Sequence, residues 1–119
     1  MSENKYLNEI SDKFNCIYKV IDFIEKNYVE NHPVELYADM CKLNKYYFIK
    51  LFRECTGVSP HLYKTKIRIE KAKELLTNTQ MRNDEIAEQV GYSTSYYFSR
   101  IFKVHVGVSP NAFRKQVKK

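Results

Sequence analysis

The chain has 119 residues, of which 44% are hydrophobic, and it carries a formal net charge of +6. This length suits one compact domain or two small subdomains, and only three glycines and three prolines argue against a loop-rich β fold and against a glycine-rich phosphate-binding loop. The polar N-terminus, MSENKYLNEISDKFN, excludes a signal peptide, and no apolar run approaches the roughly 20 residues that span a membrane, so we expect a cytoplasmic protein with no membrane partner.

Apolar residues at helical spacing, separated by short polar breaks, predict an all-α fold of about seven helices. The expected helices, in chain order, cover residues 14–28, 34–41, 45–55, 60–76, 83–90, 94–105 and 110–115. Residues 1–11 are expected to form a flexible lead-in. We see no segment with the alternating pattern of a strand.

Capping residues mark several of these helix ends. Asn44 precedes the third helix as an N-cap candidate, and Gly57 follows it as a C-terminal stop. Ser59 and Pro60 open the long fourth helix as its N-cap and its first helical residue. Asn83 is the expected N-cap of the fifth helix, whose first turn carries the acidic residues that a helix N-terminus favours.

The chain contains two nearly identical seven-residue strings. YYFIKLF at 46–52 returns as YYFSRIF at 96–102, and each copy is followed by GVSP, at 57–60 and 107–110. Two copies are too few for a solenoid and indicate a duplicated unit. Each copy is a short helix, a tight turn and a second helix, which is the helix-turn-helix pattern. We therefore expect helix-turn-helix subdomains at 12–58 and 78–119, joined by a long central helix at 59–77.

The charge is distributed unevenly along the chain. Residues 1–40 hold four Lys/Arg and eight Asp/Glu, whereas residues 41–119 hold sixteen and six. The positive excess coincides with the duplicated unit and points to a polyanion, most often nucleic acid. A solvated surface is the plainer alternative, and a basic all-helical protein-interaction module without specific DNA readout stays open as the rival function.

Helical geometry separates an inner and an outer face on the second helix of each copy. The inner faces hold Phe48, Leu51, Phe52 and Cys55 in the first copy and Phe98, Ile101 and Phe102 in the second. The outer faces hold Tyr46, Ile49, Lys50 and Arg53 in the first copy and Ser95, Tyr96, Ser99, Arg100 and Lys103 in the second. The shared Phe, Leu/Ile and Phe lie inside, whereas Ile49-Lys50 and Ser99-Arg100 differ on the outer faces, so the copies suit two different half-sites on DNA.

Particular side chains are expected to contact DNA in each way. The candidates for contact with bases are Tyr46, Ile49, Lys50, Ser95, Tyr96, Ser99 and Arg100. Arg100 suits a bidentate contact with guanine and Lys50 a less rigid one, while Tyr46, Tyr96 and Ile49 suit thymine methyls or sugars. The candidates for contact with the DNA backbone are Asn44, Lys45, Arg53, Lys64, Lys66, Thr94, Lys103, Arg114 and Lys115. Arg68 fits a phosphate contact and a structural role equally well.

Signals for other chemistry are weak. The cysteines at 16, 41 and 55 form no C-x-x-C pair, and no histidine lies at a zinc-finger interval, so we expect no metal and no cofactor. We expect reduced thiols, with Cys41 and Cys55 as small buried hydrophobes. No nucleophile motif or His–carboxylate pairing indicates an enzyme. An RNA-binding role suits the two-motif spacing less well than a duplex groove does.

The chain resembles the DNA-binding domain of AraC/XylS-type bacterial transcription regulators. The motifs that carry the resemblance are Ile86-Ala87, Gly91-Tyr92, residues 97–103, residues 107–110 and Phe113-Arg114, with Arg68, Ala72, Leu75 and Leu76 in the linking helix. The resemblance implies a sequence-specific regulator of double-stranded DNA that inserts two recognition helices into successive major-groove segments. It further implies RNA polymerase and an N-terminal effector or receiver domain as candidate partners. One departure is that the first turn has Leu43-Asn44 and no glycine.

Overall fold

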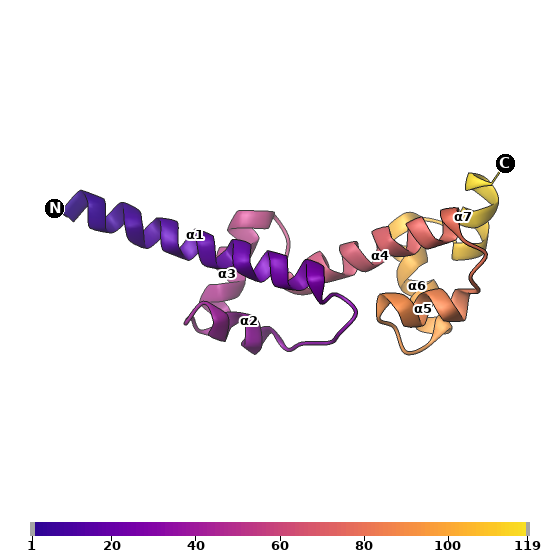
Figure 1. Cartoon of the computed structure of the whole chain (residues 1–119), viewed down its shortest axis with the longest axis horizontal. Helices are drawn as coiled ribbons and strands as arrows, with labels where there is room; N and C mark the ends of the chain where they lie inside the picture. Colours follow the sequence, from indigo (N-terminus) through magenta and orange to yellow (C-terminus); the bar gives the residue numbers. More distant parts are fainter. Residues whose placement is uncertain (1, 119) are drawn as a thin grey trace. The chain divides into compact units, whose positions relative to one another are not determined.

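A computed structural model of the chain describes the backbone of residues 2–118 and the side chains of residues 12–118. This part folds into seven α-helices and no strand, which confirms the all-α prediction (Figure 1). The helices are α1 (Ser2–Lys26), α2 (Val34–Met40), α3 (Lys45–Thr56), α4 (Pro60–Asn78), α5 (Asn83–Val90), α6 (Ser95–Val106) and α7 (Pro110–Val117). Unit 1 comprises the chain up to Asn27 together with His32–Lys64, and unit 2 comprises Tyr28–Asn31 together with the chain from Thr65 onward.

The first helix is longer than its apolar pattern predicted. α1 begins at Ser2, so the predicted start near Phe14 was wrong. Residues 2–13 contain neither proline nor glycine, and nothing in their backbone chemistry ends a helix that the apolar stripe further along supports. Flexibility of residues 1–11 stays a prediction, because Met1 and the side chains of residues 2–11 lie outside the described residues.

The core of unit 1 forms where α1, α2 and α3 meet. Ile17 of α1 and Phe48 and Phe52 of α3 are fully buried. The ring of Tyr63, near the start of α4, packs edge-on against Phe52 with their centroids 5.6 Å apart. Burying each of these large side chains contributes about 1.5–3 kcal/mol, so this contact set fixes the orientation of α3.

Unit 2 repeats that arrangement with the second copy of the string. Phe98 and Phe102 of α6 are fully buried, and the ring of Phe113 lies edge-on to Phe102 with their centroids again 5.6 Å apart. The two phenylalanines shared by the repeated strings therefore form equivalent cores, as predicted. Of the other residues expected on the inner faces, Leu51 is buried, whereas Cys55 and Ile101 are half-buried.

Glycines and polar caps set the ends of the recognition helices. Gly57 and Gly107 cap α3 and α6 with positive φ angles of 83° and 96°, a conformation that glycine adopts at little cost. At the start of α3 the side chain of Asn44 accepts a hydrogen bond from the backbone N–H of Tyr47. The glycine-free first turn instead places Lys42 at a φ of 55°.

The serines of the two GVSP strings act as predicted. Ser59 Oγ accepts from the N–H of Leu62, and Ser109 Oγ accepts from the N–H of Ala112. The prediction for α5 was wrong by one residue, because its N-cap is Arg82 and not Asn83. The Glu85 carboxylate accepts from the N–H of Arg82 at 3.1 Å, which satisfies a donor at the start of this helix.

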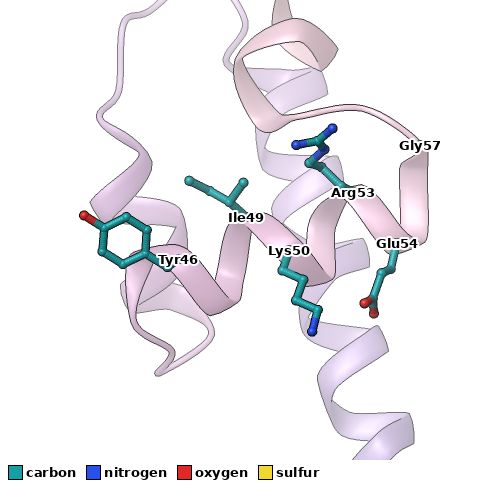
Figure 2. Close-up of a pocket in the computed structure, with 6 residues that line it drawn as sticks. All are labelled: Tyr46, Ile49, Lys50, Arg53, Glu54 and Gly57. Carbon is teal, nitrogen blue, oxygen red and sulfur yellow. The ribbon is translucent and has the colours of Figure 1, made fainter.

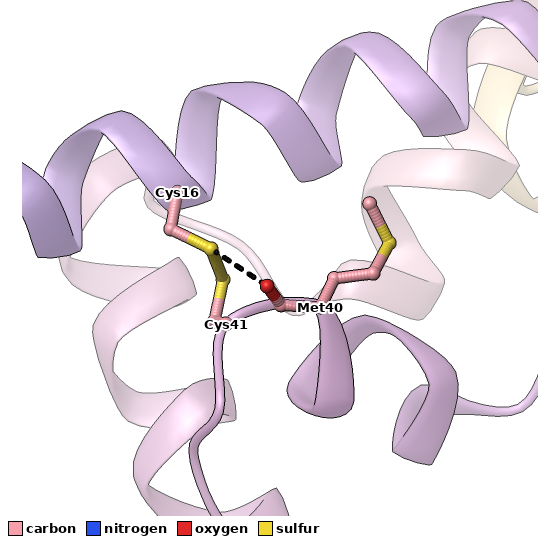
Figure 3. Close-up of a disulfide and its surroundings, with 3 residues drawn as sticks. All are labelled: Cys16, Met40 and Cys41. Carbon is pink, nitrogen blue, oxygen red and sulfur yellow. Dashed lines mark hydrogen bonds between the residues drawn. A yellow bond between two sulfur atoms is a disulfide. The ribbon is translucent and has the colours of Figure 1, made fainter.

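A disulfide joins α1 to the end of α2 within unit 1. Figure 3 shows Cys16 bonded to Cys41, whose Cα atoms are 5.6 Å apart. The expectations of reduced thiols and of Cys41 as a plain buried hydrophobe were therefore wrong, and only Cys55 is a free thiol. The carbonyl oxygen of Met40 lies 3.4 Å from the Cys16 sulfur, so an acceptor is in place for a Cys16 thiol when the bridge is reduced.

Candidate nucleic-acid interface

The outer face of α3 combines exposed aromatic and cationic side chains. Tyr46 is 80% exposed, Lys50 and Arg53 are exposed, and Ile49 is half-buried between them. These four side chains line an open hollow of about 480 Å³ together with Glu54 and Gly57 (Figure 2). Three of the four residues predicted on the outer face of the first motif are thus exposed.

The outer face of α6 presents the equivalent positions with different chemistry. Tyr96 is 72% exposed, Arg100 is exposed and Ser99 is half-buried. The guanidinium carbon of Arg100 lies 5.8 Å from the centroid of the Tyr96 ring, within the range of a cation–π contact. Arg100 therefore lies beside the Tyr96 ring and stays exposed to solvent.

The residues predicted to contact the DNA backbone fall into two groups. Exposed polar or cationic side chains are Asn44, Lys45, Arg53, Lys66, Thr94, Lys103 and Lys115. Asn44 and Thr94 also cap their helices by accepting from the N–H groups of Tyr47 and Tyr97. Asn44, Lys45 and Thr94 lie at the N-termini of α3 and α6, where the helix dipole favours an anion.

Two of the predicted phosphate contacts are occupied inside the protein. Lys64 is only 7% exposed. Arg114 is half-buried, and its guanidinium donates to the carbonyl oxygens of Leu76 at 3.3 Å and Met81 at 2.6 Å, which leaves it holding the end of α4. We therefore leave both residues out of the interface. The Leu76 carbonyl lies in the last turn of α4, where a helix leaves carbonyls without partners, and Met81 lies just before α5.

An ion pair reduces the positive charge at the start of α3. The Lys45 ammonium lies 3.4 Å from the Glu35 carboxylate, and it is also 6.0 Å from the centroid of the Tyr46 ring. The pKa of Glu35 is lowered, chiefly by a hydrogen bond from its own backbone N–H and further by Lys45. Both partners are exposed, so the pair is weak and Lys45 can exchange Glu35 for a phosphate.

Arg68 is buried and bonded within the protein, and it does not lie on the surface. It is 5% exposed, and its Nε donates to the carbonyl oxygen of Tyr28 at 2.7 Å. Its Nη2 donates to Asn31 Oδ1 at 3.0 Å, and its guanidinium stacks on the ring of Tyr92 at 5.0 Å from the centroid. Of the two roles that the sequence left open, the structure supports the structural one.

Comparison with known proteins identifies the family. Residues 37–116 match the family model of a helix-turn-helix domain. The structure is similar to the C-terminal domain of AraT, a response regulator from Geobacillus stearothermophilus, with a TM-score of 0.80 and 36% identity over 85% of this chain and 84% of that one. The chain belongs to the AraC/XylS-type helix-turn-helix family. It is therefore a member of a family of DNA-binding transcription regulators, as the sequence motifs predicted.

Two other transcription factors are similar over much of the chain. The lactose operon transcription activator of Staphylococcus xylosus is 37% identical over 76 residues, which make up 64% of this chain and 27% of the activator. The chain thus spans about a quarter of the length of that relative. The DNA-binding domain of the global transcriptional factor AdpA, solved in complex with a target DNA, has a TM-score of 0.78 and 25% identity over 84% of this chain and 90% of that one.

Searches for other kinds of site gave negative results over the described residues. None of the helices there combines the length and the apolar character that crossing a membrane requires. The same residues contain no cluster of three or more His, Cys, Asp or Glu side chains placed to hold a metal ion.

Two features next to α3, the first recognition helix of this AraC/XylS-type domain, were not predicted from the sequence. The Lys13 ammonium donates to the Tyr47 hydroxyl at 3.1 Å and lies 5.2 Å from the centroid of its ring, so α1 supports the start of α3. Glu54 adds a carboxylate to the otherwise basic hollow on α3. Its spacing of four residues from Lys50 was a signal for this placement, whereas the contact between Lys13 and Tyr47 depends on tertiary structure.

Proposed function

We propose that this chain binds double-stranded DNA sequence-specifically by inserting α3 and α6 into the major groove at two half-sites. The observation that carries the proposal is the pair of equivalent exposed faces, Tyr46 with Lys50 on α3 and Tyr96 with Arg100 on α6. Each face lies on the second helix of a helix-turn-helix motif, the element that reads base edges in this class of protein.

The side chains on each face supply complementary contacts for DNA. Arg100 offers paired N–H donors to the O6 and N7 acceptors of guanine, and its stacking on Tyr96 limits the conformational freedom lost on binding. Lys50 offers a single ammonium to the same acceptors. Arg53 and Lys103, exposed one turn further along each helix, are the proposed phosphate contacts that fix the orientation of the motif.

We further propose that the chain is the DNA-binding part of a transcription regulator that acts through RNA polymerase. The match covers only 27% of the lactose operon transcription activator, and the matched AraT structure is the C-terminal domain of a response regulator; both support a regulatory role for the shared domain. An effector or receiver domain elsewhere in a longer protein is part of the same proposal. Half-sites are expected about one helical turn apart, ~10 base pairs, as is usual for paired helix-turn-helix motifs.

Selection of binding sites from a random duplex library tests the proposal. A recovered consensus with two separate half-sites supports it. Recovery of no consensus, with equal binding to all duplexes, contradicts it and favours the basic protein-interaction module. Affinity is to be measured at several salt concentrations, because phosphate contacts make binding weaken steeply as salt rises.

A further inference from the structure

Ile49 gives the exposed face of α3 an apolar centre. Its side chain is half-buried and lies one turn from Tyr46, which is 80% exposed. Lys50 and Arg53 lie on either side of the same hollow (Figure 2). An aliphatic group with cations beside it matches a ligand that has a small apolar group close to anionic ones.

The equivalent surface of α6 has a polar residue at this position. The residue that corresponds to Ile49 in the repeat is Ser99, while Tyr46 is matched by Tyr96 and Lys50 by Arg100. Ser99 and Ile49 are both half-buried, but Ser99 is polar and Ile49 is apolar. A preference that depends on an apolar contact at this position is therefore expected from α3 alone.

Major-groove chemistry limits what Ile49 can contact favourably. Thymine presents a C5-methyl group there, whereas the other bases present N–H donors and N or O acceptors. Placing an isoleucine against one of those polar groups removes its water without supplying a hydrogen bond, which is unfavourable. An apolar protein partner is a poorer match for the hollow, because Lys50 and Arg53 would lose hydration at such an interface without gaining phosphates.

We propose that Ile49, supported by Tyr46, is a specificity-determining residue that makes the half-site of α3 depend on the 5-methyl group of thymine. The half-site of α6 has no such dependence at the equivalent base pair, because Ser99 stands there. This inference rests on the proposed DNA-binding function and assigns a chemical class of base to one of its two motifs.

Replacing thymine by deoxyuracil tests the inference, because it removes the methyl group and leaves base pairing unchanged. Each thymine of the selected site is replaced in turn, and the dissociation constant is measured by fluorescence anisotropy. We expect about fourfold weaker binding at one or two thymines of the α3 half-site, the effect of losing one buried methyl-sized group. The thymine that corresponds to Ser99 in the α6 half-site is expected to change binding less than twofold.

Variants at the paired positions provide matched controls. I49S is expected to abolish the response to deoxyuracil, I49V to keep it, and S99I to create one in the α6 half-site. Assignment of half-sites comes from the base pairs whose readout changes in K50A and in R100A. Thermal melting checks that unit 1 of I49S is folded. If I49S melts early, I49A is used in its place.

The outcomes separate this inference from the proposed function. If deoxyuracil has no effect anywhere in a well-defined site, or if I49S responds like the parent protein, the inference fails and specific DNA binding stands. If selection recovers no site at all, the proposed function fails first and the inference falls with it.

Discussion

The guanidinium of Arg68 lies directly against the α-carbon of Gly91. A Cβ atom at position 91 would come within 2.8 Å of Arg68 Cζ and within 2.7 Å of the carbonyl oxygen of Val29. The guanidinium donates to carbonyl oxygens of the segment Tyr28–Asn31, which belongs to the same compact unit. Gly91 therefore leaves room for a buried arginine that holds this segment onto unit 2.

Gly91→Ala is expected to destabilise unit 2 by about 2–4 kcal/mol, because it combines a positive φ of 110° with overlap against backbone and guanidinium atoms. Gly107→Ala is the matched control, since Gly107 has a φ of 96° and nothing within 4 Å of an added Cβ. It is expected to cost about 1 kcal/mol from the backbone conformation alone. Urea unfolding of both variants checks the difference, and equal losses would contradict the packing role of Gly91.

Arg68→Ala is expected to lower the free energy of unfolding by about 2–4 kcal/mol, because several carbonyl oxygens lose their donor in a buried site. Arg68→Lys restores the charge but not the fork of N–H groups, so we expect it to recover only part of the loss. Lys66→Ala is the control, because Lys66 is exposed on the same helix. Melting temperatures distinguish the roles: unchanged stability in R68A with weakened DNA binding would make Arg68 a phosphate contact.

Reduction of the disulfide is expected to destabilise unit 1. The bridge between Cys16 and Cys41 closes a loop with a sequence separation of 25 residues, and the entropy model for such a loop gives about 3.5 kcal/mol. Thiol titration of the denatured protein is expected to find one free thiol before reduction and three after it. Cys16→Ser should melt like the reduced protein, and Cys55→Ser should melt like the oxidised one. Three free thiols in protein purified without reductant would show that the bridge does not form.

Arg100→Ala is expected to weaken binding to the selected site by about 1–3 kcal/mol and to relax the preference at one or two base pairs. Lys103→Ala, three residues along the same helix, is expected to weaken binding to every duplex alike and to reduce the salt dependence by about one phosphate contact. Titrations on the selected site, on its single-base variants and on random DNA check both. If R100A lowers affinity equally on all of them, Arg100 belongs with the phosphate contacts.

The Cys55 thiol is expected to become reactive at a higher pH than an ordinary cysteine. Burial raises the pKa of the Cys55 thiol, and the negative charge of Glu54 raises it further. Because the thiolate is the reactive form, alkylation is expected to become fast only at higher pH than for an ordinary cysteine. Glu54→Gln should move the rate profile part of the way back, since burial remains. A profile identical to that of a free cysteine peptide would contradict this environment.

The repeated strings explain why much of the fold followed from the sequence. Gly57 and Gly107, and Ser59 and Ser109, act through local backbone chemistry that is visible in the letters themselves. The inward positions of Phe48 and Phe98 followed from helical periodicity. The base contacts assigned to the outer faces stay a prediction, because exposure makes a contact feasible without determining its partner.

Features that depend on tertiary contacts could not be predicted from the local sequence. Three partners of Arg68 are backbone carbonyls 38–40 residues away, and every residue type has a backbone carbonyl, so the sequence does not reveal them. Cys16 and Cys41 meet only because α1 packs beside α2. Arg114 was expected at a phosphate because it is a cation in a basic region, yet its guanidinium donates to the carbonyl oxygens of Leu76, in the last turn of α4, and of Met81, just before α5.

Methylation interference on the selected DNA site tests the central claim most directly, because it probes the N7 atoms of guanine in the major groove. We expect two separate groups of interfering positions, with K50A removing sensitivity only in one group and R100A only in the other. A single group, or two groups that both variants leave unchanged, would contradict an account in which α3 and α6 each read bases in the major groove.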